Sequence, residues 1–159
     1  MIRAIFEDTR NKPGKHDNIK KYCEENGIEI IRQQLYVGDY TLVKNQSVCI
    51  DTKKDLCELC MDYSHGTSGK GDYGRFLREV ARAKAHGIKL IVLIEDSTIH
   101  SFDDVAKWRN PQLTKYPHAL TGMTLMHRML DTHIHYGTEF LFCSKEQTGS
   151  KIIELLSDA

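Results

Sequence analysis

Two aspartates and a lysine flank a predicted β-hairpin, and together they could hold a divalent metal and activate a water molecule. Asp39 comes just before the first strand, Asp51 ends the return strand, and Lys53 follows two residues later. Side chains alternate along a strand, so Asp51 and Lys53 point to the same face if the strand runs that far. The hairpin would bring Asp39 back beside Asp51, although twelve positions separate them in the chain. The spacing therefore raises the hypothesis of a metal site at this strand end.

The pattern of strands and helices around this group predicts an α/β domain. The hairpin comprises residues 40–43 and 47–50, two β-rich runs on either side of a polar break. Further strands are expected at residues 2–6, 28–35, 88–95 and 140–143, and helices at residues 18–26, 53–63, 73–86, 121–135 and 147–157. Asp17 and Ser101 are expected to cap helices. Because the hairpin forces one antiparallel pair, the central sheet should be mixed and flanked by helices, with the apolar strand 88–95 covered on both faces.

Composition limits the classes of function. A chain of 159 residues suits one domain with a proper core, and 22 basic residues balance 22 acidic ones. A net charge of zero argues against nucleic-acid binding driven by overall charge, but it leaves room for a local basic groove. The longest apolar run has five residues, so no membrane span is expected. The first residues lack a signal-peptide layout, and the default expectation is a cytoplasmic protein.

The five cysteines are an odd number without a framework spacing, which favours free thiols in a reducing compartment. Cys57 and Cys60 form a Cys-x-x-Cys pair on a predicted helix, where a structural role is the simpler interpretation. Zinc binding by this pair with His65 and redox chemistry are the alternatives. The glycine-rich residues 65–71 are predicted to be a loop, either a flap over a ligand or a plain connector.

Four short elements in register resemble the XPF-type nuclease domain of the PD-(D/E)XK superfamily of metal-dependent nucleases. They are Asp8-Thr9-Arg10 after the first strand, Gly38-Asp39-Tyr40 before the hairpin, Ile50-Asp51-Thr52-Lys53 after it, and Gly74-Arg75-Phe76 before a helix. The match covers roughly residues 2–95 as a catalytic core. Residues 96–159 would complete a single domain and resemble short phage or bacterial stand-alone members. The resemblance implies a restriction-endonuclease-like fold.

The resemblance also implies roles for individual residues. Asp39, Asp51 and the backbone carbonyl of Thr52 would bind Mg²⁺ or Mn²⁺, and Asp8 would join them directly or through water. Lys53 would orient or help deprotonate the attacking water and offset charge in the transition state. The predicted DNA contacts are Arg10, Lys54 and Arg75. For Arg75 the alternative is an ion pair with Glu79 one helical turn away.

Each of these carboxylates, taken alone, also has a simpler structural interpretation, and these alternatives remain open. Asp39 follows a glycine, as turn aspartates commonly do, and Asp51 could cap the next helix. Asp8 alone is an ordinary strand-end carboxylate, and Glu7 would take its place if the strand presented the other face. Together, at spacings that one fold requires, they favour a metal site.

The chain departs from the family signature at two positions. Thr52 stands where the family's Glu-Arg-Lys element has arginine, which removes a cation expected near the scissile phosphate. The family's trailing aspartate would fall at Cys57. The helix-hairpin-helix module that often accompanies the domain is not expected after Glu95.

The resemblance implies a Mg²⁺-dependent DNA endonuclease that cuts branched or flapped DNA during repair or recombination, in a bacterial or phage-infected cell. Homodimerisation is a family expectation, and Met123, Met126 and Met129 could supply its surface or belong to the core. The alternative function is a weak or inactive DNA-binding or scaffold module that keeps the nuclease fold.

Overall fold

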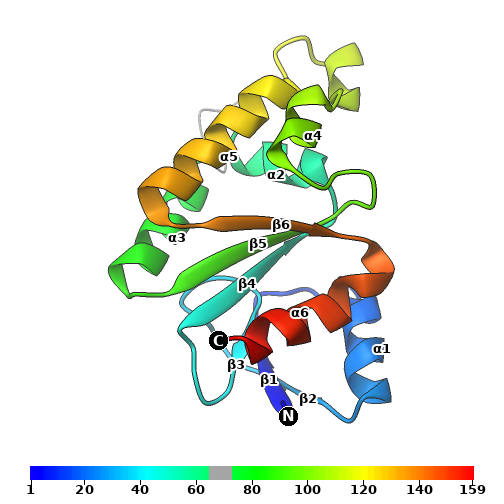
Figure 1. The fold of residues 1–159 in the computed structure, drawn as a ribbon, viewed down its shortest axis with the longest axis vertical. Coiled ribbons are helices and arrows are strands. Elements are labelled where there is room, and N and C mark those ends of the chain that lie inside the picture. Colours follow the sequence, from blue (N-terminus) through cyan, green and yellow to red (C-terminus); the bar gives the residue numbers. More distant parts are fainter. Residues whose placement is uncertain (65–72) are drawn as a thin grey trace.

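The computed structural model describes residues 1–64 and 73–159 (Figure 1). A six-stranded sheet runs through the molecule in the order β2-β1-β3-β4-β5-β6. The strands are β1 (Ala4–Glu7), β2 (Glu29–Arg32), β3 (Tyr40–Leu42), β4 (Val48–Lys53), β5 (Lys89–Glu95) and β6 (Glu139–Cys143). Strand β3 pairs antiparallel with both β1 and β4, while the other neighbours are parallel. The predicted mixed sheet and its hairpin are confirmed.

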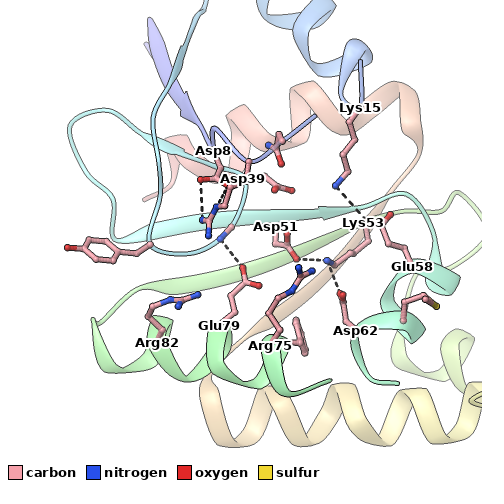
Figure 2. A pocket seen from close by; sticks show the side chains of 16 residues that line it. Asp8, Lys15, Asp39, Asp51, Lys53, Glu58, Asp62, Arg75, Glu79 and Arg82 are labelled. Atoms are coloured by element: carbon pink, nitrogen blue, oxygen red, sulfur yellow. Dashed lines mark hydrogen bonds and ion pairs between the residues drawn. The ribbon is translucent and has the colours of Figure 1, made fainter. Parts of the chain in front are cut away.

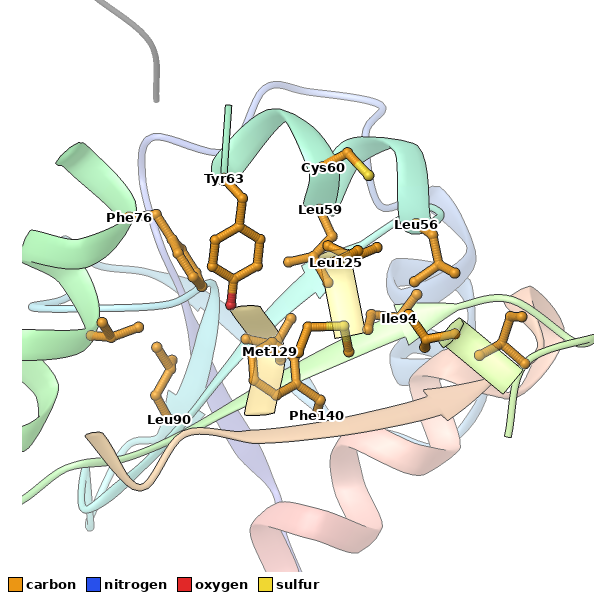
Figure 3. Close-up of a cluster of buried hydrophobic side chains, with 14 of the residues drawn as sticks. Leu56, Leu59, Cys60, Tyr63, Phe76, Leu90, Ile94, Leu125, Met129 and Phe140 are labelled. Atoms are coloured by element: carbon orange, nitrogen blue, oxygen red, sulfur yellow. The ribbon is translucent and has the colours of Figure 1, made fainter. Parts of the chain in front are cut away.

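Helices cover both faces of the sheet. They are α1 (Asp17–Glu25), α2 (Leu56–Asp62), α3 (Tyr73–Ala85), α4 (Phe102–Lys107), α5 (Gly122–Tyr136) and α6 (Thr148–Ser157), with short 3-10 turns at Pro111–Thr114 and Lys145–Gln147. Helices α2 to α5 bury one set of apolar side chains against the sheet (Figure 3), and α1 and α6 bury a second set on the opposite face. Strand β5 contributes to both sets, with Val92 on one face and Leu93 on the other. Its predicted coverage on two faces is therefore confirmed.

Strand β4 is longer than the hairpin alone predicts. Its parallel pairing with β5 continues to Lys53, which lies opposite Ile94, so Asp51 is inside the strand rather than at its end. The helix-cap interpretation of Asp51 is therefore wrong. Asp55 caps α2 instead, and its side chain accepts a hydrogen bond from Glu58 N at 2.8 Å.

Other predictions at helix ends have mixed outcomes. Ser101 caps α4 as expected, because its side chain accepts a hydrogen bond from Asp104 N. Asp17 is the first residue of α1, and His16 occupies the cap position, so the predicted Asp17 cap is wrong. No helix within residues 1–64 and 73–159 combines the length and apolarity needed to cross a membrane.

The methionine stripe of α5 divides between core and surface. Met129 is fully buried, Met126 packs against the same core, and Met123 is exposed. Most of the stripe therefore belongs to the core, and homodimerisation stays a family expectation. The division of one domain into residues 1–95 and 96–159 also stays a prediction, although β6 joins the same sheet as β5.

Candidate active site

A cleft of about 360 Å³ lies where the hairpin meets α2 and α3 (Figure 2). Acidic and basic side chains line it together. The carboxylates are Asp8, Asp39, Asp51, Glu58, Asp62 and Glu79, and the cations are Arg10, Lys15, Lys53, Arg75 and Arg82. A chain with no net charge thus concentrates charges of both signs in one hollow.

The turn before β3 presents Asp39 to this cleft. Gly38 has a φ of 74°, and a Cβ at that position would lie 3.0 Å from the carbonyl oxygen of Ile50, so glycine suits both the conformation and the close approach. Asp39 N donates to Ile50 O at 2.7 Å, and the carboxylate Oδ2 accepts hydrogen bonds from Thr52 N and Thr52 Oγ1 at 2.9 and 2.8 Å. Burial and the nearby charge of Asp51 raise the pKa of Asp39 to about 7. The structure therefore brings Asp39 and Asp51 together, as the hairpin predicts.

Lys53 joins two buried carboxylates. Its Nζ lies 2.9 Å from Asp51 Oδ2 and 2.8 Å from Asp62 Oδ2, and only 11% of its side chain is exposed. Burial alone would lower the pKa of Lys53, but the two carboxylates outweigh it and raise the pKa well above its ordinary value. Asp51 and Lys53 share a face of β4, as strand alternation requires.

Asp62 was not predicted as a site residue. It is the last residue of α2 and lies one helical turn beyond the fully buried Leu59, so the same inward stripe carries both. That spacing is the one signal of its position in the sequence. Asp62 thus adds a buried carboxylate to the cleft.

The donor set of the cleft fits a hard divalent cation. Asp51 Oδ2 and Asp62 Oδ2 are fully buried and receive no well-directed hydrogen bond, so the Lys53 ammonium is their compensation. The raised pKa of Asp39 reports burial and the charge of Asp51, and a cation between these carboxylates would relieve both. Across residues 1–64 and 73–159, no three acidic, histidine or cysteine side chains are already gathered as a ready metal site.

Asp8, not Glu7, faces the cleft. Arg10 donates two hydrogen bonds to the Asp8 carboxylate, from Nε at 2.7 Å and Nη2 at 3.2 Å, and Leu35 N donates a third at 3.0 Å. The hydrogen bond and charge of Asp8 raise the pKa of Arg10. Glu7 lies on the other side of β1, where it contacts Arg32 and Tyr40. Asp8 is thus already held by a cation at the cleft edge.

Helix α3 contributes two side chains to the cleft: Glu79, which was not predicted as a site residue, and Arg75, which was. Glu79 Oε1 accepts a hydrogen bond from Gly38 N at 3.0 Å and lines the cleft beside Arg75. In the described part of the chain Arg75 makes no ion pair with Glu79, so that alternative is wrong. Arg75 is exposed and free to meet a ligand.

Lys54 and Thr52, also predicted site residues, lie outside the cleft lining. Lys54 borders a neighbouring hollow near Glu58. The Thr52 side chain occupies the face of β4 opposite Asp51 and Lys53, where it contacts Asp39 and His16. The expected loss of a cation beside a phosphate at this position stays a prediction.

The surroundings of the Cys-x-x-Cys pair, Cys57 and Cys60, support the structural interpretation. Cys57 Sγ lies 4.0 Å from Asn110 Oδ1, and Asn110 Nδ2 lies 3.9 Å from Cys60 Sγ. Burial raises the pKa of Cys60 to about 12, which disfavours the thiolate that a metal requires. The predicted free thiols are confirmed. His65 and the glycine-rich residues 65–71 lie outside the described residues.

Comparisons with known proteins identify the family and the fold. A family model described as the ERCC4 domain matches residues 8–156. The structure of XPF from Aeropyrum pernix superposes with a TM-score of 0.64 at 18% identity, over 96% of this chain and 63% of that one. The structure of XPF from Aeropyrum pernix in complex with DNA gives 0.62 at 19% identity, over 98% of this chain and 64% of that one. These structures share the fold, and this chain spans less than two thirds of their length. A comparison with curated proteins found no match.

Proposed function

The chain belongs to the ERCC4 domain family, and from this membership and its cleft we propose that it is a metal-dependent DNA endonuclease that hydrolyses phosphodiester bonds. The fold is that of an XPF-type nuclease domain. The observation that carries the proposal is the convergence of Asp39, Asp51 and Lys53 in one cleft lined by arginines. Branched or flapped DNA is the substrate class that the family membership suggests.

Asp39 and Asp51 would hold Mg²⁺ or Mn²⁺ with the backbone carbonyl of Thr52, and Asp8 would reach the same ion through water. A bound divalent ion supplies a water with lowered pKa and polarises the phosphate. Asp39 is suited to this role because its Oδ2 is fixed by Thr52, while Oδ1 has no hydrogen-bond partner among residues 1–64 and 73–159. Asp8 shares its charge with Arg10, which suits an outer position.

Lys53 acts as a cation in this proposal. Its raised pKa keeps the ammonium protonated near neutral pH, so it would orient the attacking water and offset negative charge on the phosphate. Of the two roles expected for this lysine, orientation therefore has more support than deprotonation. Asp51 and Asp62 hold the ammonium in place from two sides.

The arginines of the cleft would hold the DNA backbone. Arg75 and Arg82 lie on α3 at one side, and Arg10 lies at the other side beside Asp8. Guanidinium groups bind phosphate oxygens through paired donors, which suits recognition of backbone independent of sequence. These arginines would give the cleft a locally positive border, so the chain could bind DNA there although its net charge is zero.

One observation favours the alternative of a weak or inactive DNA-binding scaffold. Three of the acidic groups in the cleft are already paired with protein cations, Asp8 with Arg10 and both Asp51 and Asp62 with Lys53. A site neutralised in this way would bind a metal more weakly. Retention of the complete Asp39, Asp51 and Lys53 group supports the nuclease.

A cleavage assay separates the two functions. Wild-type protein is incubated with branched, flapped and linear duplex DNA in Mg²⁺ or Mn²⁺, beside Asp51→Asn, Lys53→Met and the exposed control Asp158→Asn. We expect cleavage by wild type and the control and loss in both cleft variants. DNA binding without cleavage by wild type in either metal would favour the scaffold. Cleavage unchanged in Asp51→Asn and Lys53→Met would contradict the assignment of the site.

A further inference from the structure

A chain of buried hydrogen bonds runs from the far side of the sheet to Asp39. Glu7 Oε2 accepts from the Tyr40 hydroxyl at 2.6 Å, and that hydroxyl lies 2.7 Å from His16 Nδ1. His16 Nε2 lies 3.0 Å from Thr52 Oγ1, which donates to Asp39 Oδ2 at 2.8 Å. His16 is 8% exposed and Thr52 is 2% exposed, so water does not compete freely for these groups.

The direction of the hydrogen bonds follows from the carboxylate. Ionised Asp39 can only accept, so the Thr52 hydroxyl must give its single proton to Oδ2. The Thr52 oxygen can then accept from His16 Nε2, in the tautomer that carries its proton on that nitrogen. Neutral His16 leaves Nδ1 as an acceptor that faces the Tyr40 hydroxyl together with Glu7. Tyr40 holds the other side of the imidazole, and its ring also packs against the imidazole with centroids 5.5 Å apart. His16 therefore complements and stabilises the orientation of the Thr52 hydroxyl that Asp39 requires.

We propose that His16 is a positioning residue for the metal ligand Asp39, acting through the hydroxyl of Thr52. This inference rests on the proposed metal-dependent nuclease. The two hydrogen bonds from Thr52 fix Oδ2 and leave Oδ1 for the metal. Thr52, which stands where the family signature has arginine, thus holds the proposed metal ligand Asp39 by hydrogen bonds instead of presenting a cation to DNA.

The alternative is a purely structural role, in which this chain of hydrogen bonds only stabilises the packing of the start of α1 against the sheet. A structural role of that kind would change stability but would leave the affinity for metal unchanged in molecules that remain folded. Partners that orient metal ligands, in contrast, typically change metal affinity by about 10- to 100-fold when they are removed. Metal affinity measured without DNA therefore distinguishes the two roles.

The test measures Mn²⁺ binding to the folded full chain by electron paramagnetic resonance, together with cleavage as a function of Mn²⁺ concentration. Thr52→Val keeps the backbone carbonyl and removes the hydroxyl, and it should weaken Mn²⁺ binding by about tenfold or more. Thr52→Ser restores the hydroxyl and should bind like wild type. His16→Phe should weaken binding in the same direction. The double variant Thr52→Val with His16→Phe should bind Mn²⁺ with an affinity within about twofold of that of Thr52→Val alone, because His16 acts through Thr52.

Thr132→Val provides a matched control for the loss of a buried threonine hydroxyl. Thr132 is 3% exposed, and its Oγ1 lies 2.7 Å from the Tyr63 hydroxyl, in the core of the opposite face. It should lose stability comparably and keep wild-type Mn²⁺ affinity. The positioning role is overturned if Thr52→Val and His16→Phe bind Mn²⁺ like wild type, if their effects add fully, or if Thr132→Val weakens binding equally. Wild-type protein that neither binds Mn²⁺ nor cleaves DNA would overturn the nuclease itself, and the positioning role with it.

Discussion

Glu79 and Gly38 are joined by a hydrogen bond of 3.0 Å from the glycine backbone nitrogen to the glutamate Oε1. This bond ties α3, which carries the arginines, to the turn that presents Asp39 (Figure 2). Burial and the charge of Asp51 raise the pKa of Glu79, so the acid is kept at an electrostatic cost. We infer that Glu79 positions α3, with its proposed DNA-binding arginines, relative to the proposed metal ligand Asp39.

Glu79→Gln and Glu79→Ala should therefore behave differently. Glutamine keeps an acceptor for Gly38 N and removes a charge beside Asp51, so stability at pH 7 should equal or exceed that of wild type. Alanine leaves the Gly38 nitrogen without its partner and should destabilise the fold by about 1–3 kcal/mol. Denaturant unfolding checks both, and equal loss in the two variants would contradict the role of the hydrogen bond.

Gly38→Ala should destabilise the chain by more than the backbone conformation alone explains. The positive φ costs a non-glycine residue about 1–2 kcal/mol, and the added Cβ would also press on Ile50 O. Gly87→Ala is the matched control, because Gly87 has a φ of 66° and nothing within 4 Å of the added atom. Similar unfolding free energies for the two variants would show that the contact is unimportant.

Lys53→Met should cost both stability and cleavage. Removing the ammonium leaves Asp51 and Asp62 buried without a counter-ion, a change that typically costs about 3–5 kcal/mol. Adding Asp62→Asn to Lys53→Met should recover part of the stability but none of the cleavage. Unfolding and cleavage measured on the same samples would separate these effects, and recovery of cleavage in the double variant would count against Lys53 in the chemistry.

Asp39→Asn should change the pH dependence of stability in the absence of metal. The folded pKa of Asp39, about 7, lies above its ordinary value of 3.8, so the folded state holds this proton more tightly. Wild-type stability should therefore fall, relative to the asparagine variant, as pH rises from about 4 through about 7, by up to a few kcal/mol at roughly 1.4 kcal/mol per pKa unit. Unfolding in a chelating buffer at several pH values tests this. A difference independent of pH would refute it.

Arg75→Ala and Arg82→Ala should weaken DNA binding about equally for all sequences. Each lost phosphate contact should lower the slope of log affinity against log salt by about one. Arg78→Ala is the control, since Arg78 is exposed on the same helix but does not line the cleft. Binding is measured in Ca²⁺ by fluorescence anisotropy at several salt concentrations. A salt slope that falls equally for Arg78→Ala would argue against the cleft as the DNA path.

The parts of the site that are close in sequence could be predicted, and the parts that depend on packing could not. The hairpin brings Asp39 beside Asp51 through local turn and alternation rules. Asp62 and Glu79 reach the cleft only because α2 and α3 pack on β4 and β5, and sequence periodicity does not specify which partners meet. The wrong cap at Asp51 has the same origin, because β5 extends the strand beyond its hairpin partner.

The hydrogen bond between Glu79 and Gly38 has a consequence for folding, because 41 positions separate its two residues. The hairpin closes a short loop, whereas the parallel pairing of β4 with β5 must first enclose α2 and α3. Long-range closure loses more chain entropy before contacts compensate, so it forms late. We expect Asp39 and Asp51 to come together early with the hairpin, and Lys53 and the arginines of α3 to take their places only when β5 pairs with β4. A partly folded chain would then lack the surface proposed to hold DNA, and the proposed cleavage would require the complete fold.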